Sequence, residues 1–346
     1  MTQMTQEILE TPGAIAQCLA ANGDKLAALV AEIQARDIQQ VILAARGTSD
    51  HAATYGKYAL ELLTGVPVSL AASSIYTIYG KGLRLQKNAL VIGISQSGAA
   101  ADVLAVLAGA KAAGALTVGI TNNEQSGIAQ SVDVHLSCAA GPELSVAATK
   151  TFTTEIFLLA KLAALWAQNA ALNAELDALP QTLQSVLAQA DAVESIVTRY
   201  RFIDSCFVLA RGVNYAIAQE AALKIQETTY VRALAFAASD FLHGPIAMLH
   251  RDIPALIFAP TGAALPDIQA ILTRLAGENV ETLVVTDDSE TARLGSFALR
   301  VPSAQNELVS PFYGVLIAQM FACSLSLLKG LTPDTPRGLN KVTITK

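Results

Sequence analysis

Short apolar runs alternate with longer helical patterns along the whole chain, and this alternation constrains the fold more than any other feature. Such alternation is typical of a parallel sheet covered by helices on both faces. The predicted strands are 39–45, 89–95, 116–121, 133–138, 206–210, 254–260, 281–288 and 297–303. The predicted helices are 50–63, 100–113, 150–168, 214–229, 265–276 and 309–329. We therefore expect an α/β fold.

The two halves of the chain repeat one pattern. ILAARGTSDHAA in the first half resembles VLARGVNYAIA in the second, each reading as a strand, then Arg-Gly, then a helix. A repeat at about half the chain length predicts two related domains. We expect an N-terminal helical segment at 1–35 and a first domain at 36–168. A helical connector that Pro180 breaks follows at 169–197, and the second domain is expected at 198–346.

Charge and hydropathy exclude several classes of protein. The net charge of −6 argues against nucleic acid as a partner. No uninterrupted apolar run reaches the roughly 20 residues that span a bilayer, so we expect no membrane partner. The first residues, MTQMTQEILETPGAIAQ, lack the basic and apolar regions of a signal peptide.

The cysteines indicate the compartment. Cys18, Cys138, Cys206 and Cys323 lie far apart without the spacing of metal ligands. Cys206 and Cys323 stand in apolar runs and are expected to be buried thiols. With no disulfide framework in the sequence, we expect a soluble protein of the reducing cytoplasm and no metal site.

Hydroxyl-rich or glycine-containing segments follow three strands of the first half, at 47–49, 95–98 and 121–123. In a parallel sheet these loops open at the edge where such folds bind ligands. Ser95-Gln96-Ser97-Gly98 stands between a strand and a helix, where its hydroxyls either cap the helix or bind an anion. No nucleotide-binding glycine motif is present, which favours a small phosphorylated metabolite.

Titratable groups gather in the second half. Glu220, Lys224 and Glu227 fall on one helix face among mostly apolar neighbours. They form either a solvated ion-pair stripe or part of a cleft. His243 is expected in a turn before a helix, presented by a loop or merely structural. Lys341 belongs to a basic tail, for which a solvated position is the ordinary expectation.

Taken in order, these segments resemble the double-SIS (sugar isomerase) family. They are most similar to its glucosamine-6-phosphate deaminases and to the isomerase half of glutamine–fructose-6-phosphate aminotransferase. The similar stretches run from about residue 44 to the C-terminus: RGTSDHA, SQSGAAADVL, GPELSVAATKTFTTE, ARGVNYAIAQEAALKIQETTY, FAASDFLHGPIAML and PRGLNKVT. The resemblance implies two tandem SIS domains, each a doubly wound, mainly parallel sheet flanked by helices.

The resemblance also implies roles for particular residues. Glu227 would be the base that moves a proton between C1 and C2, with Lys224 and Lys341 near the open-chain sugar. His243 would assist ring opening from a neighbouring subunit, which implies at least a homodimer. No cofactor or metal is implied. The positions that would hold the substrate and its phosphate are Thr48, Ser49, Ser95, Gln96, Ser97, Ala148 and Glu220.

Two positions depart from the family pattern. Ala100 stands where the family often has threonine, which removes one phosphate hydroxyl, and Ala148 stands where it often has serine. These departures affect the expected ligand contacts and leave the acid–base groups intact.

The reaction expected from this resemblance is a deamination. The aminotransferase needs a glutamine-cleaving domain, whereas this chain begins about forty residues before its first SIS strand. We therefore expect glucosamine 6-phosphate to be converted to fructose 6-phosphate and ammonia. A phosphosugar isomerase or a deglycase, acting on galactosamine 6-phosphate or a fructosamine 6-phosphate, would use the same groups. A non-catalytic sugar-phosphate sensor would not need Glu227, His243 and Lys341.

Overall fold

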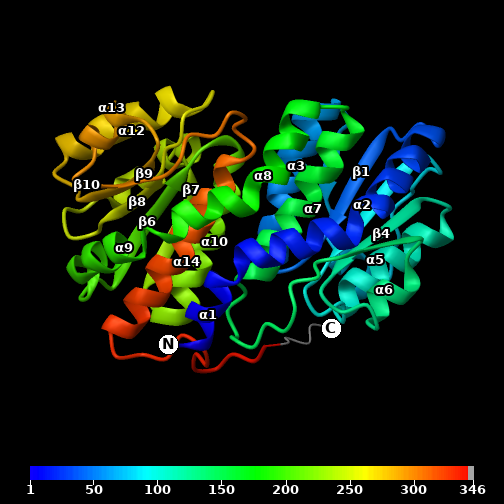
Figure 1. Ribbon diagram of the computed structural model, residues 1–346, viewed down its shortest axis with the longest axis horizontal. Helices are drawn as coiled ribbons and strands as arrows, with labels where there is room; N and C mark the ends of the chain where they lie inside the picture. Colours follow the sequence, from blue (N-terminus) through cyan, green and yellow to red (C-terminus); the bar gives the residue numbers. More distant parts are fainter. Residues whose placement is uncertain (342–346) are drawn as a thin grey trace. The chain divides into compact units, whose positions relative to one another are not determined.

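The structure, a computed structural model, describes residues 1–341 and contains two five-stranded parallel sheets (Figure 1). This confirms the expected α/β class and its two sheets. The chain divides into two compact units. The unit named the N-unit comprises Glu10–Glu143, Lys150–Ala178 and, at the end of the described chain, Asn340 and Lys341. The C-unit comprises Met1–Leu9, Leu144–Thr149 and Leu179–Leu339.

The N-unit sheet has the strand order β2-β1-β3-β4-β5. Its strands are β1 (Gln40–Ala44), β2 (Val68–Leu70), β3 (Ala89–Ile94), β4 (Leu116–Thr121) and β5 (Val134–Ser137). Four of these lie where the sequence predicts them. The fifth, β2, was not predicted, because three residues after Pro67 are too few to show a strand pattern.

Helices cover both faces of this sheet. They are α2 (Thr11–Ala35), α3 (Thr48–Thr64), α4 (Ser74–Thr77), α5 (Ala101–Ala112), α6 (Gly127–Ser131) and α7 (Lys150–Trp166). Ile42 and Val91 belong to a buried cluster with Val103 and Val106 of α5. Because side chains alternate along a strand, the intervening residues face the other side. There α3 lies against the sheet and packs with α7, which also packs with α2 (Figure 1).

The C-unit repeats the same topology. Its strands are β6 (Ser205–Ala210), β7 (Arg232–Ala237), β8 (Ala255–Phe258), β9 (Thr282–Thr286) and β10 (Phe297–Arg300), in the order β10-β9-β8-β6-β7. In both sheets the first strand pairs with the second and third. The repeat predicted from the sequence is thus confirmed. The sequence missed β7, since RALAFA has no β-branched residue and directly follows a helix.

The C-unit helices also lie in two layers. They are α1 (Gln3–Leu9), α9 (Ala190–Val197), α10 (Tyr215–Thr229), α11 (Ala238–Leu242), α12 (Leu265–Gly277), α13 (Ser289–Leu294) and α14 (Ser310–Leu328). Short 3₁₀ helices occur at η1 (Thr198–Tyr200), η2 (Gly212–Asn214) and η3 (Pro245–Met248). Phe207 and Phe241 pack edge to face at 5.1 Å in the cluster on the α12 face. On the other face α10 packs against α14.

Helix α14 is apolar and long enough, by length and composition, to cross a membrane. Within its most apolar stretch, 83% of the helix is buried inside the protein. Burial of this degree is typical of a core helix, and the contact with α10 accounts for much of it.

The connector differs from its prediction. Helix α8 (Ala170–Leu187) continues through Pro180, so the expected break at this proline is wrong. A buried leucine stripe runs along α8 on both sides of the proline, at Leu172, Leu176, Leu179 and Leu183. Burial of this stripe outweighs the backbone hydrogen bond that proline removes. The residues before β1 do not form one piece either, because α1 belongs to the C-unit and α2 to the N-unit.

We predict that Gly93→Ala in β3 lowers the stability of the N-unit by about 1–3 kcal/mol, the usual cost of overpacking a core. A Cβ at Gly93 would lie 2.5 Å from Leu107 Cδ1 and 2.9 Å from Val103 Cγ1. The matched control is Gly23→Ala in α2, where a Cβ meets nothing within 4 Å. That change should raise stability by about 0.5–1 kcal/mol through helix propensity. Urea unfolding measures both, and equal shifts would contradict the packing argument.

Candidate functional site

The strand order of the N-unit reverses at the pair β1 and β3, with Ala44 opposite Gly93. In open parallel sheets, ligands bind beyond the carboxyl ends of the strands at such a reversal. The loops 47–49 and 95–98 leave β1 and β3 at this edge. The structure therefore brings together two of the three predicted loops.

The loop after β3 is folded on its own hydroxyls. Ser95 Oγ accepts the backbone N–H of Gly98 at 3.2 Å, and Ser97 Oγ accepts that of Ala99 at 3.3 Å. The N-cap of α5 is Ala100, whose side chain makes no capping bond. The helix-capping interpretation of these serines is therefore wrong. Because a hydroxyl that accepts a bond still carries its own hydrogen, both serines keep an O–H to donate.

Gly98 is the position at which this loop tolerates no side chain. Its φ is +65°, and a Cβ there would lie 2.0 Å from Ser126 Oγ. The backbone of Gly98 also accepts the N–H of Ile128 at 3.1 Å. Packing against Ser126 and the hydrogen bond from Ile128 thus fix the loop that carries Ser95 and Ser97.

An ion pair that the sequence analysis missed joins the two loops. Arg46, at the end of β1, places Nε 2.7 Å from Oδ2 of Asp102 in the first turn of α5. The Asp102 side chain is only 3% exposed. A carboxylate at this helix end would repel an anion, and the guanidinium offsets its charge. The repeated Arg-Gly was the available signal, since Arg211 pairs with Asp267 at 2.6 Å in the C-unit.

The loop after β1 presents one engaged hydroxyl. Ser49 is buried and donates to Oε1 of Glu155 on α7 at 2.9 Å. Thr48 is the first residue of α3 and, like Gln96, is half-buried. The sequence analysis did not single out Glu155, because a glutamate inside an apolar helix gave no spacing pattern. Ser49 has to exchange this bond before it donates to any ligand.

The third predicted loop has a structural task. Asn122 donates to the carbonyl of Gly141 at 2.8 Å and accepts the N–H of Ala140 at 3.0 Å. Asn122 therefore fixes the segment that follows β5 and leads to Glu143.

Lys341 lies in the N-unit and is not simply solvated, as a basic tail ordinarily is. Its Nζ is 2.8 Å from Oε2 of Glu143, whose side chain is fully buried. The same carboxylate accepts the N–H of Thr151 at 3.0 Å and its hydroxyl at 2.7 Å. Burial opposes ionisation of Glu143, but Lys341 and the hydrogen bonds outweigh it and lower the pKa of this carboxyl.

The predicted charged face of α10 is confirmed as a buried ion-pair group. Lys224 Nζ lies 2.6 Å from Oε2 of Glu227 and 3.4 Å from Oε1 of Glu220. The side chains of Glu220 and Lys224 are 0% and 1% exposed, whereas that of Glu227 is 21% exposed. The solvated-stripe interpretation is therefore wrong, and Glu227 is the member that meets the surface.

Charge balance determines the state of Lys224. Burial favours the neutral amine, but Glu220 and Glu227 outweigh this effect and raise the pKa of Lys224. Lys224 is therefore an ammonium at neutral pH. Next to it, Glu227 offers a partly exposed carboxylate of fixed position, as a general base must be.

His243 and Ala148 also belong to the C-unit. His243 is exposed in the turn between α11 and η3, which confirms the predicted position before a helix. Ala148 is half-buried in the segment that precedes α7. The predicted residues thus form two groups, with the hydroxyl loops and Lys341 in the N-unit and the remainder in the C-unit.

The corresponding loop of the C-unit already holds carboxylates. At the reversal between β6 and β8, Ala263 N–H donates to Glu307 Oε2 at 3.0 Å. Thr261 N–H donates to Asp287 Oδ1 at 2.6 Å. Internal carboxylates therefore occupy donors that an anion would need, so the N-unit is the better candidate for binding phosphate.

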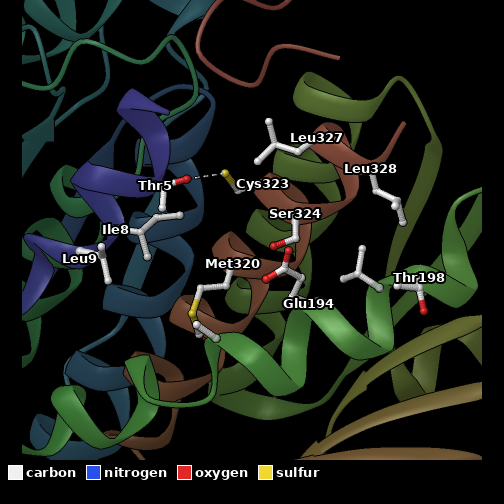
Figure 2. A pocket seen from close by; sticks show the side chains of 12 residues that line it. Thr5, Ile8, Leu9, Glu194, Thr198, Met320, Cys323, Ser324, Leu327 and Leu328 are labelled. Carbon is white, nitrogen blue, oxygen red and sulfur yellow. Dashed lines mark hydrogen bonds between the residues drawn. The ribbon is translucent and has the colours of Figure 1, made fainter. Parts of the chain in front are cut away.

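A pocket of about 450 Å³ lies among α1, α9 and α14 of the C-unit (Figure 2). In its lining, Thr5 Oγ1 and Cys323 Sγ are hydrogen-bonded at 3.3 Å (Figure 2). Its lining has a carboxylate, Glu194, and neither a lysine nor an arginine among the described residues. None of the predicted site residues lines it, and Glu194 would repel a phosphate.

Comparison with known proteins agrees with the two-domain fold. Residues 35–165 and 203–329 match the SIS domain family. A glutamine–fructose-6-phosphate aminotransferase of Aquifex aeolicus is 34% identical over 98% of this chain. The chain spans 57% of the length of that relative.

Two solved structures are similar over their whole length. One is a Silicibacter pomeroyi protein assigned as a phosphosugar isomerase, with 33% identity, a TM-score of 0.88, and coverage of 96% of this chain and 100% of its own. The other is a glucosamine-6-phosphate deaminase of Thermotoga maritima, with a TM-score of 0.77 and coverage of 99% and 100%. At 20% identity the second similarity supports the fold alone.

We predict that Lys224→Met lowers the free energy of unfolding of the C-unit by about 3–5 kcal/mol, because it removes the ammonium that pairs with the buried Glu220 and the partly exposed Glu227. Adding Glu220→Gln should recover part of this loss, since the pair is coupled. The control Arg251→Met removes a cation that is 78% exposed and should hardly change the urea midpoint. Equal midpoints for the Lys224 and Arg251 variants would contradict the assignment.

We also predict a pH dependence from Glu143. Because its pKa is lowered in the folded state, its stabilising contribution is complete above the unfolded value of 4.5 and is lost as the pH falls below it. The stability advantage of the native chain over Glu143→Gln should therefore shrink as the pH falls from about 6 to about 3.5. Urea unfolding at several pH values measures this difference. A difference that does not change with pH would show that Glu143 does not titrate in this way.

Proposed function

Because the chain belongs to the SIS domain family and contains two tandem SIS domains, we propose that it binds a sugar phosphate and moves a proton between C1 and C2 of the sugar. One observation carries this proposal. Lys224 is buried between two carboxylates, and only Glu227 of the three reaches the surface. A protein that only binds phosphosugars has no need for this costly arrangement.

The phosphate is assigned to the hydroxyl loops of the N-unit. Ser95 and Ser97 supply O–H donors beside the N-terminus of α5, and Arg46 offsets the charge of Asp102 there. Thr48, Ser49 and Gln96 complete the proposed set. Ala100 offers no hydroxyl, so the set lacks one donor that the family often has. Neutral donors and a helix end suit a dianionic phosphate.

Glu227 is the proposed general base. In the open-chain form of glucosamine 6-phosphate, Glu227 takes the proton from C2 and returns it to C1, which gives an imine at C2. Water adds to the imine, and ammonia leaves with fructose 6-phosphate. The ammonium of Lys224 stabilises negative charge that develops during the shift. His243 and Lys341 are proposed to assist ring opening and to contact the open chain.

The deaminating direction of the reaction is part of the proposal, and the cysteines of this chain are compatible with it. Release of ammonia from glutamine by a thiol requires a reactive thiolate. All four cysteines are buried, and burial raises the pKa of each thiol, to about 12 for Cys18 and Cys206. The residues that the structure describes therefore offer no thiolate for that step. We propose free ammonia as the product of the reaction of this chain, which the assay below tests.

Assembly and location are part of the proposal. His243 is exposed, and Leu242 and Met248, which precede and follow it in the chain, are 43% and 45% exposed. Exposed apolar residues in the segment that carries His243 suit a contact in a homodimer, where His243 would serve the neighbouring subunit. Four free cysteines suit a reducing compartment, so we assign the protein to the cytoplasm.

We predict that the purified chain releases equal amounts of ammonia and fructose 6-phosphate from glucosamine 6-phosphate. Glu227→Gln should lower kcat by about 10²–10⁴-fold with little change in KM, because it removes the base and keeps the shape. The control Glu278→Gln changes an exposed glutamate of the same unit and should keep the native rate.

Other substrates decide between the alternatives. Turnover of galactosamine 6-phosphate or a fructosamine 6-phosphate, without turnover of glucosamine 6-phosphate, would keep the base and change the substrate. Tight binding of phosphosugars without any turnover would contradict the enzyme and favour a sensor.

A further inference from the structure

Glu143, a buried carboxylate near the start of α7, forms an ion pair with Lys341 near the C-terminus. The Glu143 side chain is 0% exposed, and its Oε2 accepts both the Lys341 ammonium at 2.8 Å and the Thr151 hydroxyl at 2.7 Å. Its Oε1 accepts the N–H of Thr151, the second residue of α7, at 3.0 Å. A backbone N–H in the first turn of a helix has no partner within the helix, so the carboxylate serves as its acceptor.

The segment that carries Glu143 is itself fixed. Asn122 binds both the N–H of Ala140 and the carbonyl of Gly141, two residues before Glu143. Gly141 has a φ of +68°, so it makes the turn at little steric cost. Glu143 is thus anchored on both sides, by Asn122 through the loop and by Thr151 through the helix.

Lys341 needs such an anchor. A lysine side chain has several rotatable bonds, and it loses its placement unless a fixed partner holds the ammonium. Its side chain is still 24% exposed in the ion pair, so a ligand can reach it. Lys150, the buried lysine at the start of α7, is paired with Glu10 at 2.5 Å instead. Glu143 therefore pairs with Lys341, and Glu10 pairs with Lys150.

We propose that Glu143 is a positioning residue that holds the Lys341 ammonium in the geometry the reaction requires, an inference that rests on the proposed function. Lys341 contacts the substrate, whereas Glu143 acts only through Lys341. A misplacement of about 1 Å in a reacting group costs about 10²-fold in rate. Loss of Glu143 therefore reduces activity even though the catalytic side chains remain.

The first test is kinetic. Glu143→Gln should lower kcat on the substrate that the native chain turns over by about 10²-fold, with a smaller change in KM. The control Glu10→Gln removes the carboxylate partner of Lys150, the buried lysine of the same region, and should keep kcat near the native value. Equal losses in the two variants would mean that general destabilisation is responsible, and would overturn the positioning role.

A double-mutant cycle tests whether Glu143 works through Lys341. Glu143→Gln should cost almost nothing in a Lys341→Met background, because the group that it positions is already gone. Fully additive losses would overturn the proposal. Where Glu143→Gln does not fold, Thr151→Val takes its place in the cycle, since it removes one donor from Glu143 and keeps both charges.

Limited trypsin digestion tests the anchor without activity. Cleavage after Lys341 should be several-fold faster in Glu143→Gln than in the native chain or Glu10→Gln, because the lysine is no longer held. Unchanged cleavage would overturn the anchoring role. Faster cleavage in a chain that turns over no phosphosugar would support the anchor and refute the proposed function, so the two failures are distinguishable.

Discussion

The direct pairing of β1 with β3 is the constraint on which the candidate phosphate site depends. Parallel strands end at the same sheet edge, so pairing Ala44 with Gly93 sends two hydroxyl loops out side by side. The side chain missing at Gly93 lets α5 approach the sheet. This approach places the N-terminus of α5 beside both loops. The packing at a single glycine and the position of the helix end in the candidate phosphate site are therefore connected.

The two units share a topology but differ in charge at equivalent places. Each joins its first and third βα loops by an arginine–aspartate pair, Arg46 with Asp102 and Arg211 with Asp267. In the C-unit, internal carboxylates accept the N–H groups of the loop after β8. In the N-unit, serine hydroxyls accept the corresponding N–H groups, which adds no negative charge. The same topology thus gives a loop after β3 that is suited to an anion, and a loop after β8 whose N–H groups are already bound by carboxylates of the protein.

Buried lysines are a second common feature of the two units. Lys224 in the C-unit and Lys150 in the N-unit are almost fully buried and pair with carboxylates. A buried ion pair contributes little net stability against an apolar replacement, whereas loss of one partner is costly. At α10 the arrangement has a clear use in the proposed reaction, because it fixes Glu227 beside a permanent cation. At the start of α7 the two pairs expose opposite partners: in Lys341–Glu143 the lysine is 24% exposed and the carboxylate is buried, whereas in Lys150–Glu10 the lysine is buried and the glutamate is 41% exposed.

The amino-acid sequence by itself determined the strands with β-branched cores, the repeat of the two sheets and the charged face of α10, because these depend on local periodicity. It did not reveal β2 or β7, which are too short or too rich in alanine to show a pattern. The helix break predicted at Pro180 was wrong, because burial of the leucines of α8 outweighs the tendency of proline to end a helix. Only the tertiary structure decided that Arg46 meets Asp102, that Ser49 meets Glu155 and that Lys341 meets Glu143. These partners are 56, 106 and 198 residues apart along the chain. No local pattern encodes such contacts, because the order of strands in the sheet and the burial of charge bring them together.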